Sequence, residues 1–285
     1  MWGKGWETIV NKLLIASLAL ISGYSTAHEP YVAPIAYQTT NTQVAILAGY
    51  AEEALHSEYA LKSPKFEITD PKQVKSTVEP DSKLGTATVF DLKLPEAGTY
   101  RVQTTASYPL KYVQDQKEWK LFFDMAADKA PAKSERDYLI PADLKTKKIN
   151  PVEVTREWTL LTYVTKEKAS PVQPIAAPIQ VEFSTHPNEL KANQPTKVKV
   201  AKANQPLANA EVVVRAKGAT DEQAQTLKAG TDGSVDLTFP RAGEYLVEVT
   251  ESVDSKKKPS NQFYSIILCT RQISQNPYPI RILPS

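Results

Sequence analysis

Residues 92–102 read LKLPEAGTYRV and align without gaps on residues 237–247, which read LTFPRAGEYLV. In each copy a short apolar run ends at a proline, which cannot donate a ladder hydrogen bond, and a glycine follows that can turn the chain with a positive φ. A tyrosine then enters the next run, as in the tyrosine corner of immunoglobulin-like sandwiches. The repeat predicts one kind of β-sheet corner used twice, with Tyr100 and Tyr245 as fold markers without a direct functional role.

Outward from this repeat, short stretches rich in Val, Ile, Thr, Tyr and Phe alternate with Pro, Gly, Asn and Asp, and helical periodicity is scarce. We expect strands in the first half at residues 42–47, 65–69, 86–94, 99–105, 119–123 and 152–164. We expect strands in the second half at residues 179–184, 197–201, 210–216, 234–239, 244–251 and 262–268. The fold class is therefore all-β, with two tandem immunoglobulin-like β-sandwich domains after a cleaved signal peptide.

The domain boundary is predicted at residues 169–178, ASPVQPIAAP, because three prolines in so short a segment favour an extended connection. The predicted division is a signal peptide at 1–27, an N-terminal sandwich at 28–168, a Pro-rich linker at 169–178, a C-terminal sandwich at 179–270 and a tail of unclear structure at 271–285. Within the first domain, residues 51–61 predict a short inserted helix, since Ala, Glu and Leu dominate and β-branched residues are absent. The polar, Lys-rich residues 124–150 predict a long surface excursion.

The beginning of the chain is typical of an export signal. Lys4 and Lys12 precede the apolar run at 13–21, which is too short to span a bilayer and has the length of a signal-peptide core. Small residues at Ser25 and Ala27 then predict cleavage immediately before the next residue, which is a histidine. We expect a periplasmic protein.

Two further features define the exported product. Tyr24 stands where a lipoprotein signal would need a cysteine, so we expect a soluble protein. After residue 27 no segment approaches eighteen consecutive apolar residues, so no membrane span is predicted in the mature chain. That chain has 32 Lys and Arg against 31 Asp and Glu, a net charge of +1, which gives no electrostatic case for nucleic acid or anionic lipid.

Sequence motifs for catalysis are missing. The chain has no G-x-S-x-G elbow, no phosphate-binding glycine loop, no G-x-G-x-x-G and no H-E-x-x-H. Cys269 is the only cysteine, which excludes an intramolecular disulfide, a Cys-x-x-Cys motif and an iron–sulfur cluster. We therefore expect a protein that is not an enzyme, without catalytic residues and without an organic cofactor.

The residue that cleavage exposes is His28. A terminal histidine offers its α-amine and an imidazole nitrogen to one metal, a chelate that an internal histidine cannot form. The amine has an unperturbed pKa near 8, so a metal can capture it near neutral pH. Nitrogen ligands of this kind favour Cu(II), then Ni(II) and Co(II), and Zn(II) is also compatible. Pro30 lacks an amide hydrogen, so further ligands must come from elsewhere in the fold.

His56 is the best candidate partner, because the predicted helix also carries Glu52, Glu53 and Glu58 as oxygen donors. We predict His28, His56 and Glu58 as the metal ligands. The acids around His56 fit an ordinary solvated surface equally well. The third histidine, His186, precedes a proline just after a predicted strand, where a histidine usually only forms hydrogen bonds at the surface.

Four short motifs resemble a known family. They are AHEPYVAP at 27–34, VAILAGY at 44–50, LPEAGTY at 94–100 and FYSIIL at 263–268. The chain resembles the NikM-like periplasmic domain family, whose members are mostly of unknown function and are linked to cobalt and nickel transport. The resemblance covers most of residues 28–268. Family members often have Gly-His at the place of Gly49-Tyr50, so a ligand is missing here or replaced by His56, and residues 270–285 do not continue as a family strand would.

These observations leave three hypotheses. The first is a periplasmic accessory protein that binds or hands over a transition metal for uptake, of the nickel and cobalt class by resemblance, to a metal transporter or outer-membrane receptor. The second is a non-catalytic cell-envelope module whose sheet edges and loops bind a protein or a glycan. Such a module would be indifferent to an extra residue before His28. The third is a copper-dependent oxidative enzyme, which needs a second histidine beside His28.

Overall fold

The computed structural model describes residues 29–80, 84–144, 149–191 and 193–271. Its first-half elements are β1 (Glu29–Pro34), β2 (Gln38–Thr39), β3 (Gln43–Ala51), β4 (Phe66–Thr69), β5 (Lys75–Val78), β6 (Thr88–Lys93), β7 (Gly98–Asp115), β8 (Glu118–Leu121), the 3-10 turns η1 (Ala127–Lys129) and η2 (Lys133–Glu135), α1 (Pro141–Leu144) and β9 (Val152–Lys166). The second half contributes β10 (Ile179–Phe183), β11 (Thr196–Lys202), β12 (Gln205–Pro206), β13 (Glu211–Ala216), η3 (Asp221–Gln223), β14 (Gln225–Lys228), β15 (Ser234–Leu237), β16 (Gly243–Thr250) and β17 (Gln262–Arg271).

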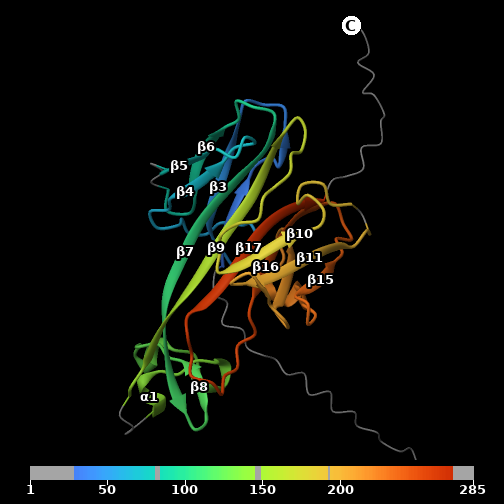
Figure 1. Cartoon of the computed structure of the whole chain (residues 1–285). Coiled ribbons are helices and arrows are strands. Elements are labelled where there is room, and N and C mark those ends of the chain that lie inside the picture. Colours follow the sequence, from blue (N-terminus) through green and yellow to red (C-terminus); the bar gives the residue numbers. More distant parts are fainter. Residues whose placement is uncertain (1–28, 81–83, 145–148, 192, 272–285) are drawn as a thin grey trace, which may run out of the picture.

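One long sheet runs through both halves in the order β14-β13-β16-β17-β9-β7-β4-β5 (Figure 1). Its longest strands, β7 and β9, pair antiparallel from Gly98 opposite Lys166 to Tyr112 opposite Val152. β9 also pairs in parallel with β17, which joins the two halves through backbone hydrogen bonds. The halves therefore share one continuous sheet.

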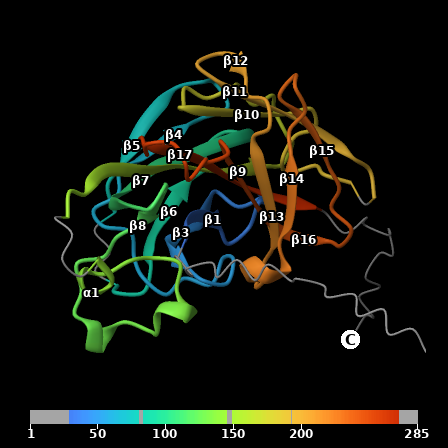
Figure 2. The same ribbon diagram turned by 90° about the horizontal axis from the view of Figure 1, so that it is seen from below.

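Two smaller sheets cover opposite faces of this long sheet (Figure 2). The sheet β1-β3-β6 covers one face, and β10-β11-β12, with β15 paired to β11, covers the other. Alternation along β16 explains this arrangement, because successive side chains of a strand point to opposite faces. Leu246 lies in the core beneath β1, whereas Tyr245 and Val247 lie in the core beneath β10 and β11. The prediction of an all-β chain with two immunoglobulin-like sandwiches is confirmed, and the two share their middle layer.

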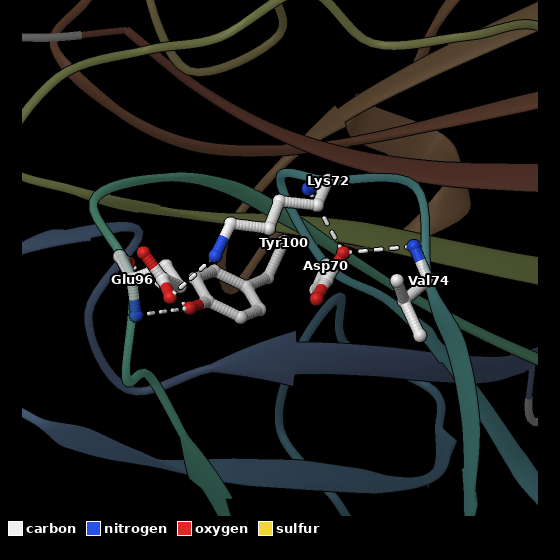
Figure 3. Close-up of polar contacts among 5 residues, drawn as sticks. All are labelled: Asp70, Lys72, Val74, Glu96 and Tyr100. Carbon is white, nitrogen blue, oxygen red and sulfur yellow. Dashed lines mark hydrogen bonds and ion pairs between the residues drawn. The ribbon is translucent and has the colours of Figure 1, made fainter.

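The corner motif of the repeat forms in both sandwiches. The hydroxyl of Tyr100 donates to the carbonyl of Glu96 at 2.9 Å and accepts from its backbone N–H at 2.8 Å (Figure 3). Nζ of Lys72 also bonds the Glu96 carboxylate at 2.6 Å. In the second copy, the hydroxyl of Tyr245 donates to the carbonyl of Arg241 at 2.7 Å and accepts from its N–H at 3.2 Å. Both tyrosines therefore form the predicted corner, in which the hydroxyl is bonded to the backbone of the residue four positions earlier.

The Pro-rich segment at 169–178 forms no helix or strand. It is nevertheless packed against the long sheet, because Ile175 is buried with Leu161, Tyr163 and Ile267. The segment therefore adds to the packing between the halves.

Residues 51–61 do not form the inserted helix that their composition predicted. They form turns, and Leu55 takes a left-handed φ of 67°, which a right-handed helix excludes. Ala54 instead exchanges two backbone hydrogen bonds with the second half: its N–H donates to Ala219 at 3.0 Å, and its carbonyl accepts from Gly218 at 2.9 Å. Helix propensity is weak, and these tertiary bonds override it.

The predicted surface excursion forms part of a small lobe at the far end of β7 and β9 (Figure 1). Leu139 and Leu144 are buried there against Val113 and Phe122. Arg136 and Asp143 form a nearly buried ion pair at 2.8 Å, and the hydrogen bond from Arg136 lowers the pKa of Asp143. Part of this polar segment therefore has a core of its own. Within the described ranges, no helix combines the length and the apolar character needed to cross a bilayer.

Candidate functional site

The candidate site is the loop at 52–58, which follows β3 and lies beside the start of β1. In the antiparallel pairing of β1 and β3, Glu29 lies opposite Ala51, the last residue before the loop. The buried hydroxyl of Tyr31 on β1 donates to the carbonyl of Leu55 in the loop at 3.2 Å. Burial raises the pKa of this hydroxyl, so it remains a proton donor. The first strand is thus tied to this loop.

A glycine lets the loop fold back on β3. A Cβ at Gly49 would lie 1.9 Å from Oγ of Ser57 and 2.7 Å from the carbonyl oxygen of Tyr59. Only a residue without a side chain permits this approach. Ser57 then bonds the carbonyl of Thr86 at 2.6 Å. The Gly49-Tyr50 pair therefore shapes the loop, and Tyr50 itself lies half-buried opposite Pro30 of β1.

His56 is exposed on this loop and is oriented by an acid. Its Nδ1 lies 2.8 Å from Oε2 of Glu53, and about half of each side chain is accessible, 53% and 52%. Its ring also faces Gly218, since a Cβ on that glycine would lie 3.4 Å from Cε1 of His56. The histidine is thus held between its own loop and the second half of the chain. A carboxylate on one ring nitrogen is a common second partner of histidines that bind a metal through the other nitrogen.

Glu58, the acid predicted as a ligand together with His56, forms a contact within the loop. One of its carboxylate oxygens, Oε1, accepts the backbone N–H of Glu52 at 3.1 Å, across the base of the loop. Within the described ranges, no group of three or more His, Cys, Asp or Glu residues is arranged to hold a metal ion. His28 lies outside the described residues. The predicted ligand set therefore stays a prediction, of which the structure places two members on one loop.

His186 lies in another set of contacts, where both ring nitrogens are engaged. Its Nδ1 accepts the backbone N–H of Asn188 at 3.1 Å, and its Nε2 lies 3.1 Å from Oγ1 of Thr99 on β7. Burial lowers its pKa, which favours the neutral ring. Asn188 donates to the carbonyls of Tyr37 and Tyr163. The turn at 186–188 therefore links the second half to the first through hydrogen bonds, which fits a structural role for His186.

A buried charged cluster adjoins the candidate site. The carboxylate of Glu29 contacts Nη2 of Arg215 on β13, and Nη1 of Arg215 bonds Asp221 at 2.7 Å. Only 2% of the Arg215 side chain is accessible. This cluster could not be predicted from the sequence, because Glu29 and Arg215 lie far apart in the chain and no motif for such a pair is known. It binds the first described residue to the second sandwich.

The fold and the sites described above define an immunoglobulin-like β-sandwich protein. Within that class, the chain belongs to the family DUF4198, a domain of unknown function, whose model matches residues 25–252. The family resemblance noted in the sequence therefore holds at the level of an uncharacterised domain family. Comparison with curated proteins gave no match.

Several solved structures of multidomain β proteins are similar to this chain at low levels. The FN1–FN3 domains of chicken CNTN1 share 12% identity over 85% of this chain, with a TM-score of 0.24. The chain spans 65% of the length of that structure. A two-domain fibronectin type-III segment of chicken tenascin and the D0–D1 domain of intimin each share 12% identity, over 84% of this chain and 97% of theirs, with TM-scores of 0.21. Similarities this low say nothing about function.

Proposed function

We propose that the processed protein is a periplasmic accessory protein that binds a transition metal at its new amino terminus and hands it over for uptake. The proposed ligands are the α-amine and imidazole of His28, together with His56 and the Glu58 carboxylate. One observation carries the proposal: Glu29 pairs with Ala51, so the second residue of the processed chain lies at the base of the loop that bears the other two ligands.

Covalent geometry and the loop itself support this assignment. His28 is bonded directly to Glu29, so the proposed chelating residue is the chain neighbour of the residue at the base of the loop. The Glu53 carboxylate on Nδ1 of His56 favours Nε2 as the nitrogen that binds a metal. A terminal chelate plus this nitrogen would supply three nitrogen ligands.

The cargo and the partner are inferred from ligand chemistry and family resemblance. Nitrogen ligands favour Cu(II) over Ni(II) and Co(II), whereas the NikM-like resemblance of the sequence points to nickel and cobalt. The near-neutral mature chain suits recognition of a metal transporter or an outer-membrane receptor better than a lipid surface. No chemical step is assigned to the protein, whose role would be binding and transfer.

The test is calorimetric titration of Cu(II), Ni(II), Co(II) and Zn(II) into the chain that begins at His28 and into the same chain with one extra alanine in front. Tight binding that the extra alanine abolishes, and that His56→Ala and Glu58→Gln weaken, would support the proposal. Glu52→Gln, which changes an exposed acid of the same loop, is the matched control and should bind as the parent does.

The opposite results would overturn it. If neither chain binds a metal, or both bind equally weakly, the terminal site is not a metal site. The working function would then be the cell-envelope module, which should be indifferent to the residue before His28.

A further inference from the structure

Arg215 and Glu248 are diagonal neighbours on one face of the long sheet. Arg215 on β13 lies opposite Leu246 on β16, and Glu248 follows two residues later on the same strand. Paired residues, and residues two apart on a strand, share a face. Diagonal neighbours are about 7–8 Å apart, within reach of long side chains. Leu246 lies in the core that also contains residues of β1, so both charged side chains lie on that face of the sheet, and Arg215 reaches Glu29 of β1.

Each of these side chains has an unused hydrogen-bonding atom. Nε of Arg215 has no acceptor, and Oε2 of Glu248 has no donor, among the described residues. Only 8% of Glu248 is accessible, so solvent does not compensate. A buried donor and a buried acceptor on neighbouring side chains therefore lack partners. Nη2 of Arg215 is in ionic contact with Oε2 of Glu29, but these two atoms form no hydrogen bond either.

The charges that face Glu248 come from several elements. Arg215 and Glu211 lie on β13, Asp221 lies on η3 and Arg156 lies on β9. Burial raises the pKa of Glu248 to about 7, and the attraction of Arg215 opposes this rise without cancelling it. The Glu248 side chain therefore changes charge near neutral pH.

We propose that Arg215 is a two-position latch, which holds Glu29 while Glu248 is protonated and turns to Glu248 when that carboxyl loses its proton. A guanidinium keeps its charge at all these pH values, so a single buried cation is shared among Glu29, Glu248 and Asp221. Asp221 is 36% accessible and can be solvated. Glu29 is the acid that loses its partner, and the start of β1 is thereby released above neutral pH.

This latch does not depend on metal binding, so it is tested on the processed chain with a chelator present. Hydrogen exchange of the β1 amides is measured at pH 6 and pH 8, with correction for intrinsic rates. The strand has four amide hydrogens to follow, those of Glu29, Tyr31, Val32 and Ala33. We expect their protection to fall roughly tenfold at pH 8, the change expected one pH unit beyond the midpoint. Glu248→Gln should keep full protection at both pH values. Glu182→Gln, which changes an exposed acid of β10, should behave as the parent does.

Equal protection of the parent chain at both pH values would overturn the latch, and so would the same loss in Glu248→Gln. If Glu248→Gln does not fold, the parent chain labelled at arginine provides a second test. The NMR resonance of the Arg215 Nε–H is then followed as the pH is changed. A shift of this resonance with a midpoint near pH 7 is expected, and a resonance that does not move between pH 6 and pH 8 would overturn the proposal.

Discussion

Oε2 of Glu53 lies 2.8 Å from Nδ1 of His56, three residues further along the chain, and orients the imidazole on the loop beside β1. A carboxylate in this position fixes the tautomer with the proton on Nδ1, which makes Nε2 the nitrogen available to a metal. Glu53 would then act as a positioning residue and not as a ligand.

Glu53→Gln should therefore weaken metal affinity by about 10- to 100-fold, the usual cost of losing such a partner, without changing the number of metal ions bound. Titration calorimetry with the chain that begins at His28 measures both quantities. Glu52→Gln should leave the affinity unchanged. A loss of stoichiometry in Glu53→Gln would instead identify Glu53 as a ligand.

Gly218 is the residue of the second half that faces His56, and its φ is +77°. An alanine in this left-handed conformation costs about 1–2 kcal/mol. Gly218→Ala should lower the free energy of unfolding by about that amount, measured by urea denaturation, and should shift the His56 imidazole resonances, because the new Cβ would touch the ring. Gly85→Ala is the control, since a Cβ there meets nothing within 4 Å. Equal losses in both variants would contradict a special role for Gly218.

The corner hydroxyls should contribute measurable stability in both sandwiches. Tyr100→Phe and Tyr245→Phe each remove a hydroxyl that accepts one backbone hydrogen bond and donates another. We expect each substitution to lower the free energy of unfolding by about 1–2 kcal/mol in urea denaturation. Tyr108→Phe, at an exposed tyrosine, should change it by less than about 0.5 kcal/mol. An effect of Tyr100→Phe as small as that of Tyr108→Phe would show that the corner bond adds nothing.

How much of this could be predicted from sequence depends on whether the signal is local. The Pro-x-Ala-Gly-x-Tyr repeat is local, so it predicted both corners and both sandwiches. The parallel pairing of β17 with β9 joins residues about a hundred positions apart, such as Phe263 and Glu157, and has no local signature. β16 is buried on both faces, so its run of apolar residues could not reveal that it serves two cores.

The candidate site was predictable only in part, for the same reason. The acids around His56 are visible in the sequence, but which of them bonds the ring depends on the backbone of the loop. The expected helix over 51–61 was wrong because Ala54 bonds residues 218 and 219, which no local pattern reveals. The contact of Glu29 with Arg215 is equally non-local.

The buried carboxyl of Glu248 makes the free energy of unfolding depend on pH, and this free energy should fall as the pH rises. Burial raises its pKa from 4.5 to about 7, so between these values the folded chain holds a proton that the unfolded chain has lost. The stabilisation linked to this proton is complete below pH 4.5 and is lost as the pH rises through 7.

Glu248→Gln keeps the shape of this side chain and removes its titration. The variant should therefore be more stable than the parent at pH 8. The difference in the free energy of unfolding should be at most about 3 kcal/mol, because each pKa unit corresponds to about 1.4 kcal/mol. This difference should shrink toward zero at pH 4.5. Urea denaturation of both chains at pH 4.5, 6 and 8 measures this trend. Glu182→Gln removes an exposed acid of β10 and keeps Glu248, so its stability should depend on pH as that of the parent does. A Glu248→Gln variant that is less stable than the parent at pH 8 would mean that ionisation of Glu248 stabilises the fold, so that its pKa in the folded chain lies below 4.5. That result would also overturn the latch, which requires Glu248 to change charge near neutral pH.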